Sequence, residues 1–306
     1  MEDSGLMLNI SAVERDTGLS KDILRIWERR YGFPAPQRDA NGERIYPPTQ
    51  VEKLQLISRL MERGHRPGRI VSLSAKELKA LGARPNRAPP TPPGVEVFLG
   101  LIREHHLSEL RWRLTQALMK QGLQVFVHET VAPLNRAVGD AWLRGELAVF
   151  EEHLYTELVE GLLRNAIASV QLQRHPPRVL LTTFPNEQHT LGLLMVEALL
   201  SLEGVYCISL GAQTPLAEIN RAVAAHKADV VAVSFSAAFN KKQAATRLME
   251  LRAVLPSKTL IWAGGAGIGR LSGSIAGVEL LSGLESVIDK VKDWRRLNAS
   301  FADEAL

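Results

Sequence analysis

The chain has 306 residues, enough for two or three domains, and its 45% hydrophobic and 23% charged residues exclude global disorder. The single cysteine, Cys207, excludes an internal disulfide, and no apolar stretch approaches the roughly 18 residues of a transmembrane helix. Residues 1–87 carry a net charge of +5 and the remainder −1, so the basic N-terminal part indicates a local polyanion partner.

We expect a cytoplasmic protein with no membrane partner. Residues 1–10 contain two acids and lack the apolar segment of a secretory signal peptide. This expectation agrees with the absence of long apolar stretches.

A proline-rich segment divides the chain. Residues 83–94 hold five prolines in twelve positions, which favours an extended spacer over a helix. The preceding part, residues 1–82, is basic and helical in pattern. Residues 95–175 are also helical in pattern, and residues 176–306 alternate short β-rich runs with amphipathic helices. We therefore expect these four segments to be an N-terminal domain, a linker, a helical domain and an α/β domain.

The last of these parts predicts a doubly wound parallel sheet. Each β-rich run is followed by a helical stretch, the last of which covers Leu284 to Trp294. Strand–helix alternation with short links is typical of a parallel sheet covered by helices on both faces. The expected strands are Val179–Thr183, Val205–Ser209, Val230–Ser234, Thr259–Ala263 and Val278–Leu281.

The N-terminal domain predicts a helix-turn-helix. A short helix over residues 11–17 is followed by a turn at Gly18, and Ser20 is a good N-cap for a second helix over Lys21–Tyr31. A helix, a glycine turn and a basic second helix are typical of DNA-binding domains. We expect the apolar residues Ile23, Ile26 and Trp27 to face the core, and the basic residues Lys21, Arg25, Arg29 and Arg30 to face outward.

A hairpin follows the second helix. Asn41-Gly42 is a strong signal for a tight turn, and Arg38 and Arg44 lie on the two arms beside it. Their guanidinium groups are suited to clamp phosphates. Helices over residues 48–63 and 66–73 complete the domain, which we expect to be a winged helix-turn-helix.

Residues 8–75 resemble the MerR family of transcription regulators. The matching residues are Ile10-x-x-Val13, Thr17-Gly18-Leu19-Ser20, Leu24-Arg25-x-Trp27-Glu28-Arg29-Arg30-Tyr31-Gly32 and Arg44-x-Tyr46. Many members of that family continue into a long dimerisation helix, whereas here the proline-rich linker follows, so assembly must come from elsewhere. The resemblance implies binding to double-stranded operator DNA through Lys21, Arg25, Arg29, Arg30, Tyr31, Arg38, Arg44 and Tyr46.

The loop after the first expected strand of the sheet carries Glu187-x-His189-x-x-Gly192. His189 can coordinate a metal through one ring nitrogen, while Glu187 accepts a hydrogen bond from the other and fixes the tautomer. Gly192 lets a large planar ligand approach the backbone. Ligands of doubly wound sheets bind at the carboxyl ends of the strands, where this loop lies. A histidine in such a loop, taken alone, is more often an ordinary polar residue.

Small residues at two further strand ends extend the pattern. With Ser234 and Ser236, then Gly264 and Gly265, the set resembles the cobalamin-binding domain of methionine synthase and the corrin mutases, a flavodoxin-like fold. The resemblance implies that His189 is the lower axial ligand of the cobalt of a cobalamin and that Glu187 supports it. It also implies that the nucleotide tail of the cofactor lies in a pocket lined by Ser234, Ser236, Gly264 and Gly265.

The helical domain carries Trp142, Glu152 and His153 at a spacing that resembles the four-helix-bundle cap of CarH/LitR-type photoreceptor regulators. In that group these residues face the upper side of the corrin and its adenosyl group. Light-responsive members carry a histidine directly after the tryptophan, and here that position is Leu143. The resemblance therefore leaves open whether light is sensed.

The order of domains resembles the CarH/LitR-type regulators over residues 8–295. It implies a repressor whose homo-oligomerisation and operator binding are controlled by adenosylcobalamin and by light. Two alternatives remain: a MerR-type regulator of another ligand, and a light-independent sensor of cobalamin level. A cobalamin-dependent enzyme needs a substrate barrel or partner subunit but no helix-turn-helix, so we expect no catalytic residues.

Overall fold

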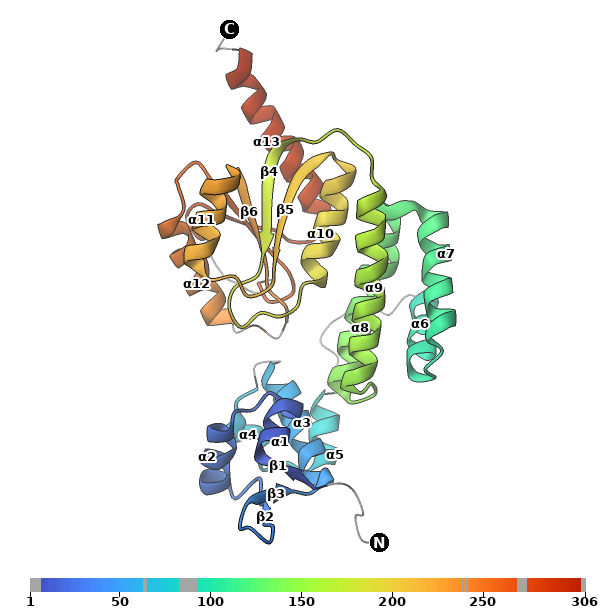
Figure 1. Ribbon diagram of the computed structural model, residues 1–306, viewed down its shortest axis with the longest axis vertical. Helices are drawn as coiled ribbons and strands as arrows, with labels where there is room; N and C mark the ends of the chain where they lie inside the picture. The colour runs from blue at the N-terminus through green and yellow to red at the C-terminus, as the bar shows by residue number, and fades with distance from the viewer. Residues whose placement is uncertain are drawn as a thin grey trace. The chain divides into compact units, whose positions relative to one another are not determined.

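The computed structural model describes residues 7–62, 65–82, 93–237, 239, 241–268 and 274–303 (Figure 1). These residues form two compact units. The first contains the described residues up to position 82 together with Gly139–Ala148, and the second contains the rest. The expected linker lies outside the described residues except for its last two positions, which begin a helix.

The first unit begins with the expected helix-turn-helix. Helix α1 (Ile10–Thr17) ends at Gly18, whose φ of 68° is left-handed, and α2 (Lys21–Tyr31) begins where the Ser20 side chain accepts a hydrogen bond from the Ile23 amide. Both helices were predicted. The helices that follow are α3 (Pro48–Glu62), α4 (Pro67–Ile70) and α5 (Ala75–Gly82), of which α5 was not expected.

The hairpin of the first unit is also as predicted. Strands β2 (Gln37–Arg38) and β3 (Arg44–Tyr46) are antiparallel and joined at Gly42, whose φ of 78° suits glycine. A short strand, β1 (Leu8–Asn9), pairs with the other side of β3, so the sheet order is β1-β3-β2. The chain segment before α1 is thereby tied to the wing.

The inward face of α2 differs from the prediction at one position. Leu24 and Trp27 are buried and pack into the core with α3, whereas Ile26 is 46% exposed. The expectation that Ile26 faces the core is wrong. With 100° between successive helical residues, Leu24, Trp27 and Tyr31 share one face, and Ile26 lies on the opposite side.

The region after the linker is helical, as predicted. It contains α6 (Pro93–Arg103), α7 (Leu107–Val125), the π-helical segment η1 (Phe126–Val131), α8 (Ala132–Arg144) and α9 (Val149–Ser169). Within the second unit α6, α7 and α9 contact one another. The end of α8 from Gly139 onward belongs to the first unit.

The C-terminal region is the predicted doubly wound sheet. Five parallel strands stand in the order β5-β4-β6-β7-β8, which is the flavodoxin-like order. The elements are β4 (His175–Thr182), α10 (Leu191–Leu202), β5 (Val205–Gly211), α11 (Leu216–His226), β6 (Val230–Ser234), α12 (Lys241–Val254), β7 (Leu260–Gly264), β8 (Val278–Leu280) and α13 (Glu285–Asp303).

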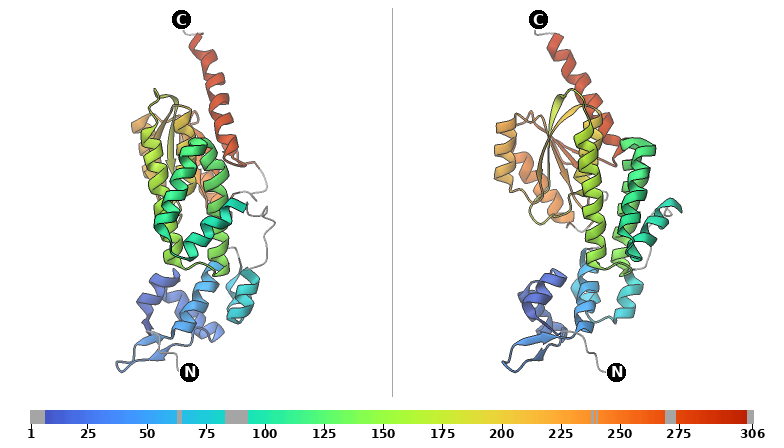
Figure 2. Two further views of the ribbon diagram at one scale, coloured as in Figure 1. Left: turned by 90° about the vertical axis from the view of Figure 1, so that its right-hand side faces the viewer. Right: turned by 45° about the vertical axis from the view of Figure 1, so that its right-hand side comes forward.

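The sheet has one hydrophobic core on each face (Figures 1 and 2). Leu180 of the central strand β4 packs with Ile219 of α11 and Leu248 of α12. Its neighbours Val179 and Leu181 point the other way, toward α10 and α13. This alternation follows from the two-residue period of a strand. It fixes β4, and with it the loop that follows, at the centre of the sheet.

The strand boundaries differ from the prediction, most of all at the start of β4. Strand β4 begins at His175 rather than near Arg178, and the register to β5 shifts between those two residues. Two prolines are accommodated there because pairing with β6 starts only at Val179. No helix among the described residues is long and apolar enough to cross a membrane.

Candidate metal centre and nucleic-acid interface

The loop between β4 and α10 brings a buried acid and an exposed histidine together. The Glu187 side chain is 1% exposed and that of His189 is 61% exposed. The His189 Nδ1 atom lies 2.7 Å from Glu187 Oε1, and the His189 amide donates to the same oxygen at 3.0 Å. Asn186 has a left-handed φ of 73°, which folds the loop tightly before the acid. The loop thus presents His189 outward on a buried carboxylate.

The carboxylate of Glu187 is held on both sides. Its Oε2 atom accepts a hydrogen bond of 2.7 Å from the Ser236 amide at the end of β6. Burial raises the pKa of this carboxyl, but hydrogen bonds from His189 and Ser236 outweigh burial, and the net pKa is below the usual value. An ionised Glu187 makes His189 Nδ1 the proton-bearing nitrogen. The nitrogen with a lone pair for a metal is then Nε2.

Small residues at the neighbouring strand ends keep the backbone close. A Cβ atom added to Gly192 would lie 3.0 Å from Ser234 Oγ, and one added to Gly265 would lie 2.3 Å from the Phe235 carbonyl oxygen. At Gly264 an added Cβ meets only Leu281 at 3.8 Å, an ordinary contact. Glycine is therefore required sterically at Gly265, while at Gly192 a side chain would make a tight contact with a serine hydroxyl.

A buried hydroxyl beside this edge matches a ligand site. Ser236 Oγ is buried and makes no hydrogen bond of standard geometry within the described part of the chain, although the side chain of Ser236 contributes to lowering the pKa of Glu187. Such a group costs free energy unless something satisfies it. With an imidazole on an ionised acid, glycines at close approach and an unsatisfied hydroxyl, the residues fit a corrinoid with a polar tail.

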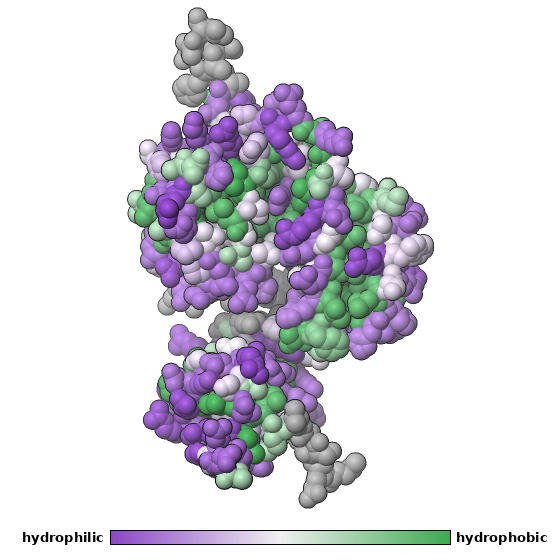
Figure 3. Space-filling model, in the orientation of Figure 1, coloured by the Kyte–Doolittle hydropathy of each residue, from purple (hydrophilic) through white to green (hydrophobic). Residues whose placement is uncertain are grey.

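Helix α9 presents the other predicted residues of the second unit. The carboxylate of Glu152 accepts a hydrogen bond from Thr156, and His153 is 70% exposed, with Nε2 at 3.7 Å from Glu152 Oε2. Phe150 and Leu154 lie on the same helix face as His153 and are 53% and 40% exposed. Apolar surface gathers over this helix in Figure 3. The start of α9 therefore combines an apolar face with an imidazole.

A hydrogen bond ties α9 to the histidine loop, and the sequence analysis missed it. Thr190, directly after His189, donates to Glu160 Oε1 at 2.6 Å. Glu160 also forms an ion pair with Arg164 at 3.2 Å and is 17% exposed. Glu160 lies seven residues after His153, hence on the same helix face. That spacing gives the helix face of Glu160 but does not predict its contact with Thr190.

Trp142 is not grouped with Glu152 and His153. It belongs to the first unit, where the guanidinium of Arg59 on α3 lies 4.7 Å from the centre of its ring. Glu152, His153 and His189 belong to the second unit. The predicted group of Trp142, Glu152 and His153 is thus divided between the two units.

The outer face of α2 carries the predicted basic residues. Arg29 is exposed, and Arg25 is exposed with a weak ion pair to Asp22 at 3.3 Å. Arg30 is exposed too, and its guanidinium lies 5.3 Å from the centre of the Tyr31 ring. Lys21 forms a long ion pair of 3.8 Å with Glu14. These weak, exposed contacts leave the cations available to phosphates.

The wing residues behave differently. Arg38 donates to the Gly42 carbonyl at 2.6 Å, which closes the hairpin. Arg44 pairs with Glu28 of α2 at 2.9 Å, and both side chains are 28% exposed. The hydrogen bond from Arg44 to Glu28 raises the pKa of Arg44. Arg44 thus joins the wing to α2 and is not an unengaged phosphate clamp.

Tyr46 was predicted to contact DNA, and the structure places it elsewhere. Its side chain is 0% exposed and packs in the hydrophobic core of the first unit. The prediction is wrong because Tyr46 points into the hydrophobic core, where it packs with helix residues that include Leu24 and Leu54. Strand β1 pairs with the edge of β3, with Leu8 opposite Tyr46.

Comparison with known proteins identifies the two ends of the chain. Residues 8–76 match the MerR HTH family of regulatory proteins, and residues 177–269 match the B12 binding domain. The class of protein is therefore a DNA-binding transcription regulator that carries a B12-binding domain.

Relatives cover nearly the whole chain. The HTH-type transcriptional repressor CarH of Myxococcus xanthus is 30% identical over 273 residues, which are 87% of this chain and 90% of that protein. The HTH-type transcriptional repressor CarA of the same organism is 30% identical over 264 residues, 86% and 88% of the two chains. This protein belongs to the family of MerR-type regulators that contains CarH and CarA.

A solved structure supports the fold of the second unit. The monomethylamine corrinoid protein of Methanosarcina barkeri matches with a TM-score of 0.50 and 14% identity, over 63% of this chain and 93% of its own. At that identity the likeness concerns the fold alone. It agrees with a helical region followed by a parallel sheet.

Proposed function

We propose that this protein is a cobalamin-controlled repressor. In this proposal adenosylcobalamin, bound with His189 as its lower ligand, favours a homo-oligomer that binds operator DNA and blocks transcription. Light reverses the assembly. The protein acts in the cytoplasm and catalyses no reaction. The observation that carries the proposal is the exposed His189 on the buried, ionised Glu187 at the central strand of a flavodoxin-like sheet.

Each residue of the second unit has a role in this proposal. When bound, adenosylcobalamin would supply a cobalt ion and a cobalt–carbon bond that light breaks. Nε2 of His189 would bind the cobalt, and Glu187 would hold the His189 ring and its tautomer. The hydroxyl of Ser236, unsatisfied within the described residues, donates to the nucleotide tail. Gly192 and Gly265 let that tail approach the sheet.

The upper side of the corrin is assigned to α9. Phe150 and Leu154 give an apolar surface for the ring, and Glu152 and His153 lie beside them to contact the adenosyl group. In the first unit Trp142 lies against Arg59. We propose that Trp142 also contacts the adenosyl group, which requires it to leave Arg59.

Control of DNA binding follows from avidity. One helix-turn-helix unit offers few phosphate contacts, but joining several units increases avidity by about 10²–10⁴. A ligand that favours the oligomer then controls DNA binding without contacting the DNA unit. The curated relatives are named as repressors, which supports the sign of regulation.

The lower ligand is tested by His189→Ala. The wild type should bind hydroxocobalamin with the absorption spectrum of a histidine-ligated, base-off corrinoid. The variant should lose that spectrum and bind cobalamin at least about 100-fold more weakly. Replacing a residue that only hydrogen-bonds to a metal ligand already costs about 10–100-fold in metal affinity. An unchanged spectrum and affinity would refute the assignment.

DNA binding is tested by salt dependence. Arg29→Ala should lower the slope of log affinity against log salt by about 0.9, because one phosphate contact is lost. Arg221→Ala, an exposed arginine of the second unit, serves as the control and should leave the slope unchanged.

The light switch is tested by gel filtration and operator binding with adenosylcobalamin in darkness, with adenosylcobalamin after illumination, and with hydroxocobalamin. Only the dark adenosylcobalamin sample should assemble and bind tightly. Leu143 favours the second candidate, a light-independent sensor of cobalamin level. If all three samples give the same oligomer and operator affinity, that second candidate is correct.

A further inference from the structure

One apolar residue stands on the outer, basic face of α2. Ile26 is 46% exposed, and three of the four residues one helical turn away from it are Asp22, Arg29 and Arg30; the fourth, Ile23, is partly buried against the core. Each of those three neighbours is charged and exposed. An isolated exposed isoleucine needs no explanation by itself. Here, however, the isoleucine occupies the face that a helix-turn-helix turns toward DNA.

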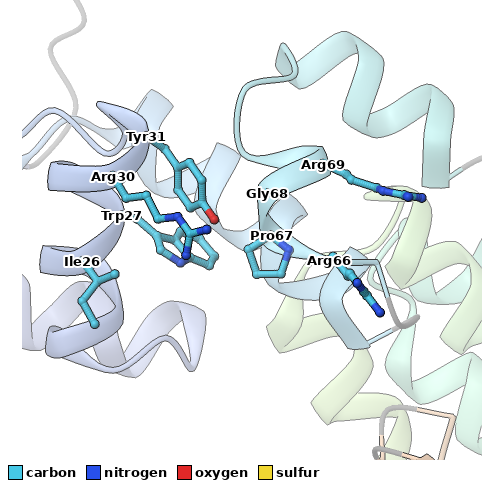
Figure 4. Close-up of a pocket in the computed structure, with 8 residues that line it drawn as sticks. All are labelled: Ile26, Trp27, Arg30, Tyr31, Arg66, Pro67, Gly68 and Arg69. Carbon is cyan, nitrogen blue, oxygen red and sulfur yellow. The ribbon is translucent and has the colours of Figure 1, made fainter.

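Ile26 is continuous with an apolar hollow. The hollow has a volume of about 430 Å³ between α2 and α4, and Trp27, Tyr31 and Pro67 line it together with Ile26. In Figure 4 Arg30 lies beside the Tyr31 ring at the edge of the hollow, while Arg66 and Arg69 point away from it. The lining therefore combines apolar side chains with three arginines, of which Arg30 lies beside an aromatic ring.

The chemistry of this surface selects an occupant. In the major groove of DNA, thymine presents a C5-methyl group, and the three other bases present no methyl group. The basic charge of the first unit and the arginines around Ile26 favour a nucleic acid over an apolar protein partner. An apolar side chain between arginines on a recognition helix is thus suited to a methyl group beside a phosphate.

We propose that Ile26 reads the C5-methyl group of a thymine in each operator half-site, while Arg30 binds a neighbouring phosphate. This proposal rests on operator binding by the first unit, as in the proposed function. It makes Ile26 a specificity-determining residue that the basic residues of α2 cannot replace. Thymine is distinguished from uracil at that position by one methyl group alone.

The experiment removes that methyl group. The full chain, loaded with adenosylcobalamin in darkness, first selects its operator from a pool of random duplexes. Each thymine of one half-site is then replaced singly by deoxyuridine, and affinity is measured for the wild type, Ile26→Ala and Ile26→Val. Loss of one buried methyl group costs about 0.8 kcal/mol of binding free energy, which makes the dissociation constant roughly fourfold larger.

At one thymine position, replacement by deoxyuridine should lower the operator affinity of the wild type about fourfold and leave the affinity of Ile26→Ala unchanged. Ile26→Val keeps an apolar side chain, so its operator affinity should fall at that position nearly as much as that of the wild type. All three proteins should respond equally at the remaining thymines. Because Ile26 is exposed, the substitutions should leave the unfolding curve unchanged, which excludes a folding defect.

Two results overturn the inference. If the chain selects an operator but Ile26→Ala shows the same response as the wild type at every thymine, the inference alone fails. An operator without a thymine in the half-site has the same meaning. If the wild type selects no sequence from the pool, operator binding itself fails, and the proposed function fails with it.

Discussion

Two pairs of a carboxylate and a basic side chain, one in each unit, differ in burial. Glu28 holds Arg44 at 2.9 Å, with both side chains 28% exposed. Glu187 holds His189 at 2.7 Å, with the acid 1% and the histidine 61% exposed. The first pair joins two elements of a surface. In the second pair the buried Glu187 orients the imidazole, and the exposed His189 is accessible to a ligand.

The energetic demands on the two acids differ as well. A buried carboxylate costs several kcal/mol unless hydrogen bonds satisfy it. Glu187 accepts from His189 and from the Ser236 amide, which brings strand β6 into the site. Glu28 stays in contact with solvent and needs only Arg44. The depth of burial therefore predicts how much each acid matters.

The largest effect is expected for Glu187→Gln. The amide cannot hold the His189 ring as an ionised acid does, so cobalamin affinity should fall about 10–100-fold. Titration with hydroxocobalamin, followed by absorbance, measures it. Glu218→Gln changes an exposed carboxylate of the same unit and should leave the affinity unchanged. Equal affinities for Glu187→Gln and the wild type would show that the buried pair does not support the ligand.

A smaller effect is expected where the histidine loop meets α9. Thr190→Val removes the hydroxyl that donates to Glu160 and should lower the free energy of unfolding of the second unit by about 1.5 kcal/mol. Thr190→Ser keeps the donor and is the matched control. Urea unfolding of the apoprotein, followed by circular dichroism, measures both. If Thr190→Ser were as unstable as Thr190→Val, the hydrogen bond to Glu160 would not explain the loss of stability.

Much of the first unit could be predicted because local signals agree there. Gly18 ends α1, Ser20 caps α2, and Asn41-Gly42 turns the hairpin. Each of these residues acts through its own backbone or its nearest neighbours. The errors concern faces: Ile26 was placed inside and Tyr46 outside, and the structure reverses both.

The reason for these errors is tertiary. Which side of α2 is buried depends on α3, and which side of β3 is buried depends on the helices whose side chains form one core with Tyr46. Neither contact is visible in the local pattern of apolar residues. Helix α5, which was also missed, has only eight residues and directly precedes the proline-rich segment.

The candidate site was predictable in part. The spacing of Glu187 and His189 gave the pair, since two residues apart in a tight loop lie close together. The Ser236 amide, 49 positions away, and the bond between Thr190 and Glu160, 30 positions apart, depend on how the sheet and helices pack. Sequence spacing carries no information about such contacts.

The partly exposed pair of Glu28 and Arg44 predicts a modest effect for Glu28→Gln. At this exposure an ion pair contributes about 0.5 kcal/mol, and salt screens it. The melting temperature of the first unit should therefore fall slightly at low ionic strength, and the difference from the wild type should shrink at about 1 M salt. A large loss that persists in high salt would show that Glu28 supports the wing by packing rather than by charge.

The smallest effect is expected for Tyr46→Phe, which tests the boundary between the core and the DNA surface of the first unit. The Tyr46 hydroxyl is buried and has no hydrogen-bond partner within the described residues, and burial raises its pKa. Replacing an unsatisfied buried hydroxyl by hydrogen keeps the ring packing and removes the desolvation cost, so stability should stay the same or rise by at most about 1 kcal/mol. Operator affinity should stay within about twofold, because the side chain does not reach the surface. Thermal unfolding and operator titration measure the two quantities. A loss of operator affinity without loss of stability would return Tyr46 to the DNA interface, where its hydroxyl would then have to find a phosphate.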